Sequence, residues 1–298
     1  EQLLKRQPKT AGEIFRSVGV KEKLPVADQI QFNPEHTPFK FQVSALRQIL
    51  KHTRYGLYDE TGVGKTLPAQ LLILLSACLG NKSVVIMPPN LIEQFTESFE
   101  STFVGTADHF KVEAMPTGPA KRQAATKRWG AEGWPDVMLL SYQMFIKVWQ
   151  TLKAHDYNTV VADEAHALKN PGTKTHAAFQ RLIGKFGSTY VLLMTGTPAH
   201  NELIDLYGLI RITAPEAYGS KRGFEYIHCN YMQIGNYKVR VGYKNRKRLS
   251  DELYKRGRRV CKEKVYDLAE PAIQEVPVTL GSAHKKLYTR LVKERVLE

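Results

Sequence analysis

Two short segments, about a hundred residues apart, carry the side chains that phosphate chemistry needs. The first runs Asp59-Glu60-Thr61-Gly62-Val63-Gly64-Lys65-Thr66. Its glycines let the backbone curl with N–H groups pointing inward, and the N-terminus of a following helix adds positive potential. Lys65 would then reach the β- and γ-phosphates of ATP, and Thr66 would ligate Mg²⁺. The general pattern has Gly where this chain has Asp59, and alone the segment could be an ordinary strand–turn–helix.

The second segment is the acidic run Asp163-Glu164-Ala165-His166, which follows a strand of the buried type. Ligands bind beyond the carboxyl ends of parallel strands, so a carboxylate there faces the binding crevice. We expect Asp163 to hold Mg²⁺, directly or through water, and Glu164 to position and deprotonate the attacking water. Alone, the run could be the exposed start of a helix, where acidic residues are favoured. Its pairing with Lys65 and Thr66 instead predicts ATP binding and hydrolysis.

The pattern around these segments predicts the elements that position them. Short apolar runs alternate with amphipathic ones along the chain. The predicted strands are 56–58, 83–87, 110–114, 137–140, 159–162 and 190–194. The predicted helices are 42–52, 65–79, 91–100, 173–186 and 202–212. Such alternation is typical of an α/β fold, with a parallel sheet covered by helices on both faces.

Some helix boundaries have a chemical reason. Asn90 is expected to cap the helix over 91–100, with Glu93 in the reciprocal position of a capping box. Gly80 suits the end of the preceding helix, and Asn201 is expected to cap the helix over 202–212.

The chain ends are less regular. We interpret residues 1–36 as an N-terminal extension, helical around 11–17, and residues 37–215 as the ATP-binding lobe. After Pro215 the pattern weakens into a basic segment, irregular or helical. An apolar run over 273–280 is predicted to be β-like, and a helix is expected from Ser282 onward.

Composition and charge narrow the classes of partner that the protein is expected to bind. The formal net charge is +14, from 43 Lys and Arg against 29 Asp and Glu, and such an excess attracts nucleic acid unless the charges are merely scattered. Basic residues crowd one stretch: Lys238, Arg240, Lys244, Arg246, Lys247, Arg248, Lys255, Arg256, Arg258 and Arg259. Three cysteines without metal-ligand spacing favour an intracellular protein, in the cytoplasm or wherever the DNA lies, nucleoid or nucleus. We expect no membrane partner, since the sequence has no apolar run of membrane-spanning length.

A third element, Leu192-Leu193-Met194-Thr195-Gly196-Thr197-Pro198, is again a strand that runs into a tight turn, and alone it would be a plain β-turn. Together with the first two, it resembles the first motor lobe of superfamily-two helicases, and more narrowly of SWI/SNF-type DNA translocases. The matching runs are 59–66, 163–170 and 195–198 with Asn201. The phosphate loop of that family also begins with Asp-Glu, so Asp59 fits the resemblance.

Softer matches extend the resemblance from Pro38 to the C-terminus. Gln42 resembles the family's adenine-reading residue. Pro89 and Asn90, and then Ser141 and Tyr142, resemble motifs that contact a DNA strand. Residues 242–265 resemble the stretch before the linker between lobes, and 280–291 the entry to a second lobe.

The resemblance implies a RecA-like lobe of a two-lobed motor that closes on ATP and steps along DNA, with duplex favoured. His166, Thr195 and Thr197 would couple the nucleotide site to DNA. No second set of RecA-like strands follows Leu297, so we expect a second motor lobe, in the same longer chain, to supply an arginine. Because such an arginine is typically worth about 10³–10⁵ in turnover, the chain alone is expected to bind nucleotide and turn over poorly.

The basic stretch offers candidates for further DNA contact: Lys244, Arg246, Lys247 and Arg248. Lys and Arg contacts to phosphates give the sequence-independent affinity that a translocase needs. The same residues could form a solvated loop or a surface between lobes.

Two other interpretations share these motifs. One is a strand-separating helicase or a restriction-type translocating subunit. The other is a nucleotide-gated DNA-binding module without turnover. An intact Glu164 argues against the module, and the missing lobe argues for it in this chain.

Overall fold

The computed structural model describes residues 8–184, 190–199, 202–266, 277 and 279–294. Two compact units are distinguished, residues 1–265 and 266–298, and each is described by itself. The predicted cap Asn201, the end of the helix over 173–186 and most of the run over 273–280 lie outside the described residues.

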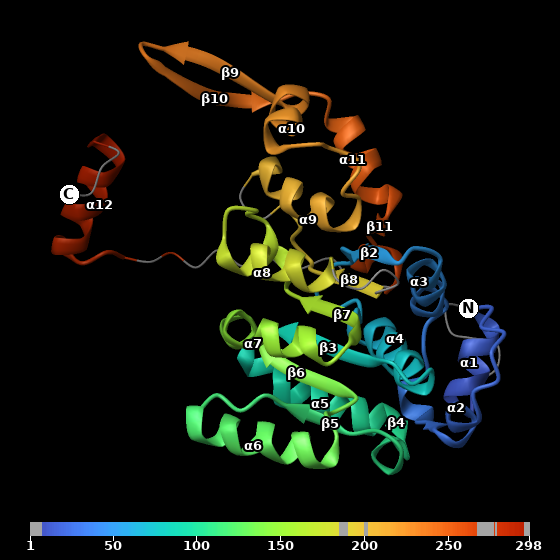
Figure 1. Ribbon diagram of the computed structural model, residues 1–298. Helices are drawn as coiled ribbons and strands as arrows, with labels where there is room; N and C mark the ends of the chain where they lie inside the picture. Colours follow the sequence, from blue (N-terminus) through green and yellow to red (C-terminus); the bar gives the residue numbers. More distant parts are fainter. Residues whose placement is uncertain (1–7, 185–189, 200–201, 267–276, 278, 295–298) are drawn as a thin grey trace. The chain divides into compact units, whose positions relative to one another are not determined.

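Within the described residues, a sheet of seven parallel strands forms the centre of the first unit, in the order β11-β2-β8-β7-β3-β6-β5 (Figure 1). In that order the strands are β11 (Gly257–Arg258), β2 (Arg54–Leu57), β8 (Tyr190–Met194), β7 (Tyr157–Asp163), β3 (Lys82–Met87), β6 (Val137–Ser141) and β5 (Val112–Ala114). The predicted α/β fold with a parallel sheet is confirmed. Because β2, β8 and β7 are neighbours, the turns that follow them meet at one edge.

The central strands are buried on both faces, which explains their continuous apolar sequences. Alternate residues belong to two buried clusters: Val84 and Ile86 of β3 to one, Val85 and Met87 to the other. The first cluster receives buried side chains from α6 (Pro119–Glu132), α7 (Tyr142–Ala154), α8 (Lys174–Ile183), α9 (Leu206–Thr213) and α11 (Arg246–Lys255). The second receives them from α3 (Lys40–Lys51), α4 (Thr66–Cys78) and α5 (Ile92–Thr102).

The N-terminal extension packs onto this second face. Helix α1 (Ala11–Ser17) forms where the sequence predicts it, capped by the Thr10 hydroxyl, and α2 (Pro25–Gln29) and η1 (Pro34–His36) follow. Strand β1 (Gln31–Phe32) pairs with β4 (Phe103–Val104), after which η3 (Thr106–Asp108) leads toward β5. Phe15 and Phe32 are buried in the same cluster as α3 and α4.

Three boundary predictions meet different outcomes. The predicted Asn90 cap is wrong: Asn90 lies inside the short 3-10 turn η2 (Pro89–Leu91), and α5 begins at Ile92 without a side-chain cap. Pro89 occupies the first position of that turn and places Asn90 too early to cap α5. Gly80 does end α4, with a φ of +74°. The helix predicted over 202–212 splits into η5 (Leu203–Asp205) and α9.

Beyond Pro215 the chain is more regular than its composition indicates. Helix α10 (Lys221–His228) precedes an antiparallel hairpin of β9 (Cys229–Ile234) and β10 (Tyr237–Tyr243), which was not predicted. Helix α11, β11 and η6 (Lys262–Lys264) complete the first unit. In the second unit, α12 (Ser282–Glu294) begins at the predicted residue. Among the described residues, no helix is both long and apolar enough to cross a membrane.

Candidate active site

The phosphate loop joins the end of β2 to the start of α4, as the sequence predicts. Gly62 and Gly64 have φ values of +84° and +86°, in the region that favours glycine. The Lys65 ammonium donates to the carbonyl oxygens of Asp59 at 2.7 Å and Glu60 at 3.0 Å. The loop is therefore curled around its own lysine at a helix N-terminus, a geometry that suits a bound polyphosphate.

Gln42, in α3, packs against the same loop. Its side chain is 5% exposed, and its amide nitrogen donates to the Gly64 carbonyl at 3.0 Å. A Cβ on Gly64 would lie 2.5 Å from that nitrogen, so the contact requires glycine. The Gln42 oxygen in turn accepts from the Phe39 N–H at 2.8 Å. The predicted adenine reader is thus held against the phosphate loop.

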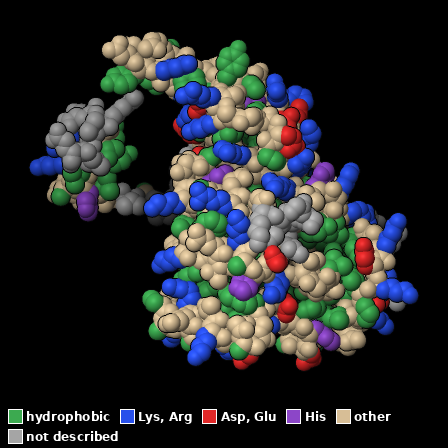
Figure 2. Space-filling view, in the orientation of Figure 1, with side chains coloured by type: hydrophobic (Ala, Val, Ile, Leu, Met, Phe, Trp, Pro, Cys, Tyr) green, Lys and Arg blue, Asp and Glu red, His purple; other side chains and the backbone are tan. Residues whose placement is uncertain are grey.

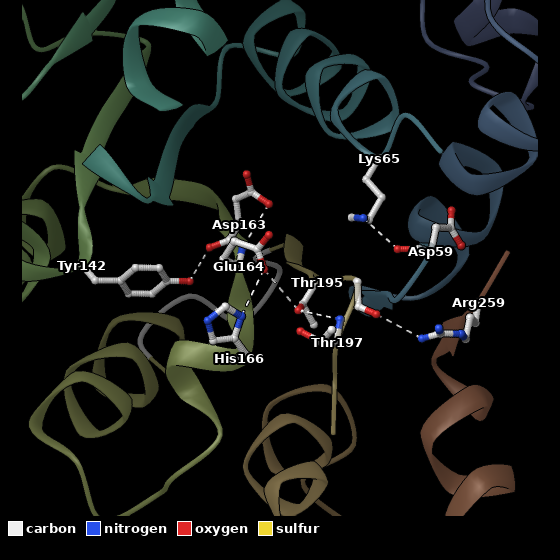
Figure 3. Close-up of polar contacts among 10 residues, drawn as sticks. Asp59, Lys65, Tyr142, Asp163, Glu164, His166, Thr195, Thr197 and Arg259 are labelled. Atoms are coloured by element: carbon white, nitrogen blue, oxygen red, sulfur yellow. Dashed lines mark hydrogen bonds and ion pairs between the residues drawn. The ribbon is translucent and has the colours of Figure 1, made fainter. Parts of the chain in front are cut away.

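The acidic run follows the neighbouring strand β7 and turns through η4 (Ala165–Leu168). The Asp163 carboxylate accepts from the Glu164 N–H at 3.0 Å, and the Tyr142 hydroxyl donates to the Asp163 carbonyl at 2.7 Å (Figure 3). Glu164 has a φ of +48°, and its carboxylate contacts His166 Nδ1 at 3.1 Å. Asp163 and Glu164 therefore hold different orientations at the edge of the sheet.

The threonine turn, residues 195–198, follows β8 and lies between these two loops, because β8 is the strand between β2 and β7. The Thr195 hydroxyl is buried, donates to Glu164 Oε2 at 3.4 Å and accepts from the Thr197 N–H at 3.2 Å (Figure 3). A Cβ on Gly196 would lie 2.7 Å from the Thr61 hydroxyl, so the turn packs directly on the phosphate loop. The structure thus brings together the three motifs that the sequence singled out.

Burial and charge act together on the ionisable groups here. Burial lowers the pKa of Lys65, while the carboxylates of Asp163 and Glu164 raise it. At Asp163, by contrast, burial raises the pKa of the carboxyl, and the Glu164 N–H and the charge of Lys65 oppose that rise. A cation bound at Asp163 would favour its charged form.

The residues present fit a Mg²⁺-nucleotide. Thr66 and Asp163 line one pocket together with Met87, Leu91, Gln94, Phe95 and Ser98. Among the described residues, no group of three or more His, Cys, Asp or Glu side chains could hold a metal. Mg²⁺ characteristically takes few protein ligands and keeps waters and substrate phosphates, so a hydroxyl and a carboxylate suit it.

The candidate DNA residues lie in several places. Pro89 and Asn90 are exposed in η2. Ser141 is buried and caps α7 by accepting from the Met144 N–H at 3.2 Å. The Tyr142 hydroxyl donates its hydrogen bond to the Asp163 carbonyl, as described above.

The basic candidates do not share one environment. Lys244, Arg246, Lys247 and Arg248 are exposed. Arg246 lines the pocket that Thr197 and Arg259 also line, whereas Lys247 pairs with Asp251 at 2.9 Å on α11. The face drawn in Figure 2 carries Lys and Arg side chains spread over the first unit.

One contact set was missed by sequence reasoning. Asp59 is 1% exposed, and its carboxylate accepts from Arg258 at 2.7 Å and from the Val260 N–H at 2.8 Å. Arg259 reaches Glu60 at 3.2 Å and the Gly196 carbonyl at 3.1 Å. From the sequence, Arg258 and Arg259 are part of the basic stretch and of the stretch before a linker, and no local pattern places them beside residues 59 and 60.

Comparison with known proteins identifies the family. The model of the SNF2-related domain matches residues 42–298, which include all three motifs. The chain belongs to the SNF2-related domain family. The predicted resemblance to SWI/SNF-type proteins is therefore confirmed.

Relatives in this family are distant and longer than this chain. The DNA repair and recombination protein RAD54B of Gallus gallus is 28% identical over 193 residues, 59% of this chain and 19% of that protein. Helicase SWR1 of Candida albicans is 29% identical over 164 residues, 54% of this chain and 10% of that protein. An uncharacterized ATP-dependent helicase, YqhH of Bacillus subtilis, is 25% identical over 198 residues, 64% of this chain and 32% of that protein.

A solved structure shares the fold. The SWI2/SNF2 ATPase core of Sulfolobus solfataricus in complex with dsDNA superposes with a TM-score of 0.57 at 21% sequence identity. The match covers 75% of this SNF2-related chain and 44% of that chain. The likeness supports the RecA-like ATPase-core fold of the described sheet.

Proposed function

We propose that this SNF2-related protein is an ATP-dependent DNA translocase, in which hydrolysis of Mg²⁺-ATP drives movement along duplex DNA. The observation that carries the proposal is the meeting of three motifs on adjacent strands: the phosphate loop after β2, the threonine turn after β8 and the acidic run after β7. A nucleotide held by the first would lie within reach of the other two.

Each residue takes a role that its contacts support. The loop 59–66 cradles the phosphates, with Lys65 stabilising their charge and Gln42 against the loop where adenine would be read. Thr66 and Asp163 hold Mg²⁺, because both line one pocket. Bound Mg²⁺ supplies charge neutralisation of the phosphates.

Glu164 acts as the base toward water. Its carboxylate is oriented by His166 and Thr195, so the base is linked to the turn that contains Thr197. Through this link, a shift of the threonine turn on DNA binding would alter the position of the base. His166, Thr195 and Thr197 are therefore the proposed coupling residues.

DNA contacts are proposed at six exposed residues: Pro89, Asn90, Lys244, Arg246, Lys247 and Arg248. Arg246 is the best supported of the basic four, because it lines a pocket with Thr197. Ser141 and Tyr142 would act behind this surface, through the start of α7 and the contact to Asp163. Binding to duplex should weaken steeply with salt if lysines and arginines contact phosphates, and salt-insensitive binding would count against these contacts.

The domain arrangement is proposed as 1–36 for an extension, 37–215 for the ATP-binding lobe and 216–298 for a basic insertion and linker. The chain spans a tenth to a third of the relatives described above, which supports a second motor lobe in a longer chain. Without an arginine from that lobe, turnover by these residues alone is proposed to be weak. Adding the second lobe should raise turnover at unchanged nucleotide affinity.

Displacement of a third strand from triplex DNA tests translocation directly. The proposal predicts ATP-dependent release of the third strand while the underlying duplex stays paired. ATP-dependent opening of a forked duplex would instead favour a strand-separating helicase. Nucleotide-dependent DNA binding without release in either assay would favour a gated binding module.

A further inference from the structure

Residues 258–262, which we call the return segment, run beside the phosphate loop. The backbone pairing that begins at β11 continues past β2: the Tyr58 N–H donates to the Arg258 carbonyl at 2.8 Å, and the Glu60 N–H donates to the Val260 carbonyl at 3.0 Å. The return segment is thus hydrogen-bonded to the loop residues themselves, about two hundred positions earlier in the chain.

The two acidic residues that open the phosphate loop are held by this segment. Asp59 is buried against Arg258, whose guanidinium also donates to the Phe41 carbonyl at 2.6 Å. Glu60 accepts from the Lys262 N–H at 3.0 Å and from Arg259 at 3.2 Å. A buried carboxylate needs such partners, so Asp59 requires the return segment, whereas Glu60, whose side chain is 33% exposed, gains hydrogen bonds from it.

Arg259 also joins the loop to the threonine turn. One guanidinium nitrogen donates to the Gly196 carbonyl at 3.1 Å (Figure 3). The other donates to Glu60. The Gly196 turn carries Thr195, which contacts the Glu164 carboxylate. Arg259 is therefore linked to the base that we propose for hydrolysis through two residues of the threonine turn, Gly196 and Thr195.

The Lys262 side chain approaches Gly62 of the phosphate loop. Its Cε and Nζ atoms are 3.0 and 3.2 Å from the point where a Cβ on Gly62 would stand. Gly62 is one of the two phosphate-loop glycines with positive φ, so the ammonium lies beside the backbone of the loop that we propose to receive phosphate. A compact, rotatable ammonium with three donors is well suited to a phosphate oxygen.

We propose that Lys262 is a phosphate-binding residue of the nucleotide site, and that Arg259 is a positioning residue that holds the phosphate loop against the threonine turn. The proposal rests on the proposed nucleotide binding at residues 59–66. It adds a cation from outside the three motifs to the same phosphates. Because the first unit ends at Val265, three residues beyond Lys262, a bound triphosphate would also anchor the chain where it leaves that unit.

Lys262 is tested by titrating the protein with a fluorescent ATP analogue in the presence of Mg²⁺. Lys262→Ala should weaken binding on the order of tenfold, as expected for a lost hydrogen bond to a charged group, and Lys262→Arg should restore most of the affinity. Lys255→Ala, which removes an exposed lysine from the C-terminal end of α11, should bind as the wild type does.

The outcomes separate this inference from the function on which it rests. Loss of binding in Lys65→Ala with wild-type affinity in Lys262→Ala would overturn the role of Lys262 alone. Equal binding by the wild type and Lys65→Ala would overturn the nucleotide site itself.

Arg259 is tested by separating affinity from turnover. Arg259→Ala should lower kcat on the order of tenfold while ATP affinity changes far less, because the side chain positions the turn and does not touch phosphate. Arg259→Lys should recover part of kcat, and thermal melting should show that both variants are folded. Unchanged kcat in a folded Arg259→Ala variant would overturn the positioning role.

Discussion

Glu164 occupies a backbone conformation that few side chains adopt. Its φ of +48° and ψ of 50° lie in the left-handed region, which costs a non-glycine residue about 1–3 kcal/mol unless its surroundings hold it there. Contacts from His166 and Thr195 to its carboxylate provide such surroundings. The Glu164 carboxylate and the Asp163 side chain hold different orientations, which separates the proposed base from the proposed metal ligand.

The role of Glu164 predicts a split between binding and hydrolysis. Glu164→Gln keeps the shape and the contacts but removes the basic oxygen, so hydrolysis should fall about 10²–10⁴-fold while ATP affinity is retained. Steady-state phosphate release and equilibrium ATP binding measure the two quantities. Glu97→Gln, at an exposed glutamate of α5, should behave as the wild type. Retained hydrolysis in Glu164→Gln would remove this residue from the mechanism.

Thr66 predicts a specific metal phenotype. Thr66→Val removes the hydroxyl and keeps the side-chain shape, so the Mg²⁺ concentration for half-maximal hydrolysis should rise about tenfold or more. Excess EDTA should stop hydrolysis in the wild type and the variant alike. Thr151→Val, on exposed surface of α7, is the control. An unchanged Mg²⁺ dependence would show that the hydroxyl does not hold the metal.

At this scale the sequence is most informative about residues in short contiguous motifs. Lys65, Thr66, Asp163 and Glu164 could be predicted because local spacing defines their chemistry. The burial of Asp59 against Arg258 could not, because the two residues are far apart in the chain and meet only through sheet pairing. Ser141 shows the same limit, since its capping role depends on a helix whose start was not predicted.

At the scale of elements, helix α9 holds the acidic run in place. A Cβ on Gly208 would lie 2.2 Å from the Lys169 carbonyl oxygen and 2.7 Å from that of Leu168, so α9 packs directly on the backbone after η4. An ion pair between Lys169 and Asp205, at 3.1 Å, joins the same two segments.

This packing predicts a stability effect opposite to helix propensity. In an unconstrained helix, Gly208→Ala would be favourable by about 1 kcal/mol. Here the new methyl meets backbone, so we expect the free energy of unfolding to fall by about 1–3 kcal/mol in urea denaturation.

Gly219→Ala is the matched control, because nothing lies within 4 Å of the point where its new methyl group would stand, and its effect should stay within about 0.5 kcal/mol. A Gly208→Ala variant as stable as Gly219→Ala would contradict the close approach of α9.

Elements with strong periodicity were predictable and those without it were not. The central strands are recognisable as short apolar runs. Helix α6 buries only Ala125 and Trp129 along its described length, so its pattern is weak. Strand β11 has two residues and is defined by pairing with β2 alone. The hairpin did carry a signal that was overlooked, a two-residue Gly235-Asn236 turn between alternating runs.

At the scale of the whole molecule, the charge and the family both support DNA as the proposed partner. The excess of 14 positive charges favours a polyanion, and the SNF2-related domain accounts for most of the chain. The sheet brings the three loops together at one edge, where the proposed ATP chemistry would take place. The cations that we place at the phosphates are Lys65 of the phosphate loop and Lys262 of the return segment.

The central claim is that these loops form one ATP-hydrolysing site that responds to DNA. The most direct measurement is ATP hydrolysis by the full-length protein without DNA, with single-stranded DNA and with duplex DNA, using Lys65→Ala as the blank. The account predicts turnover above the blank that duplex stimulates most. Turnover no higher than the blank in all three conditions would contradict it.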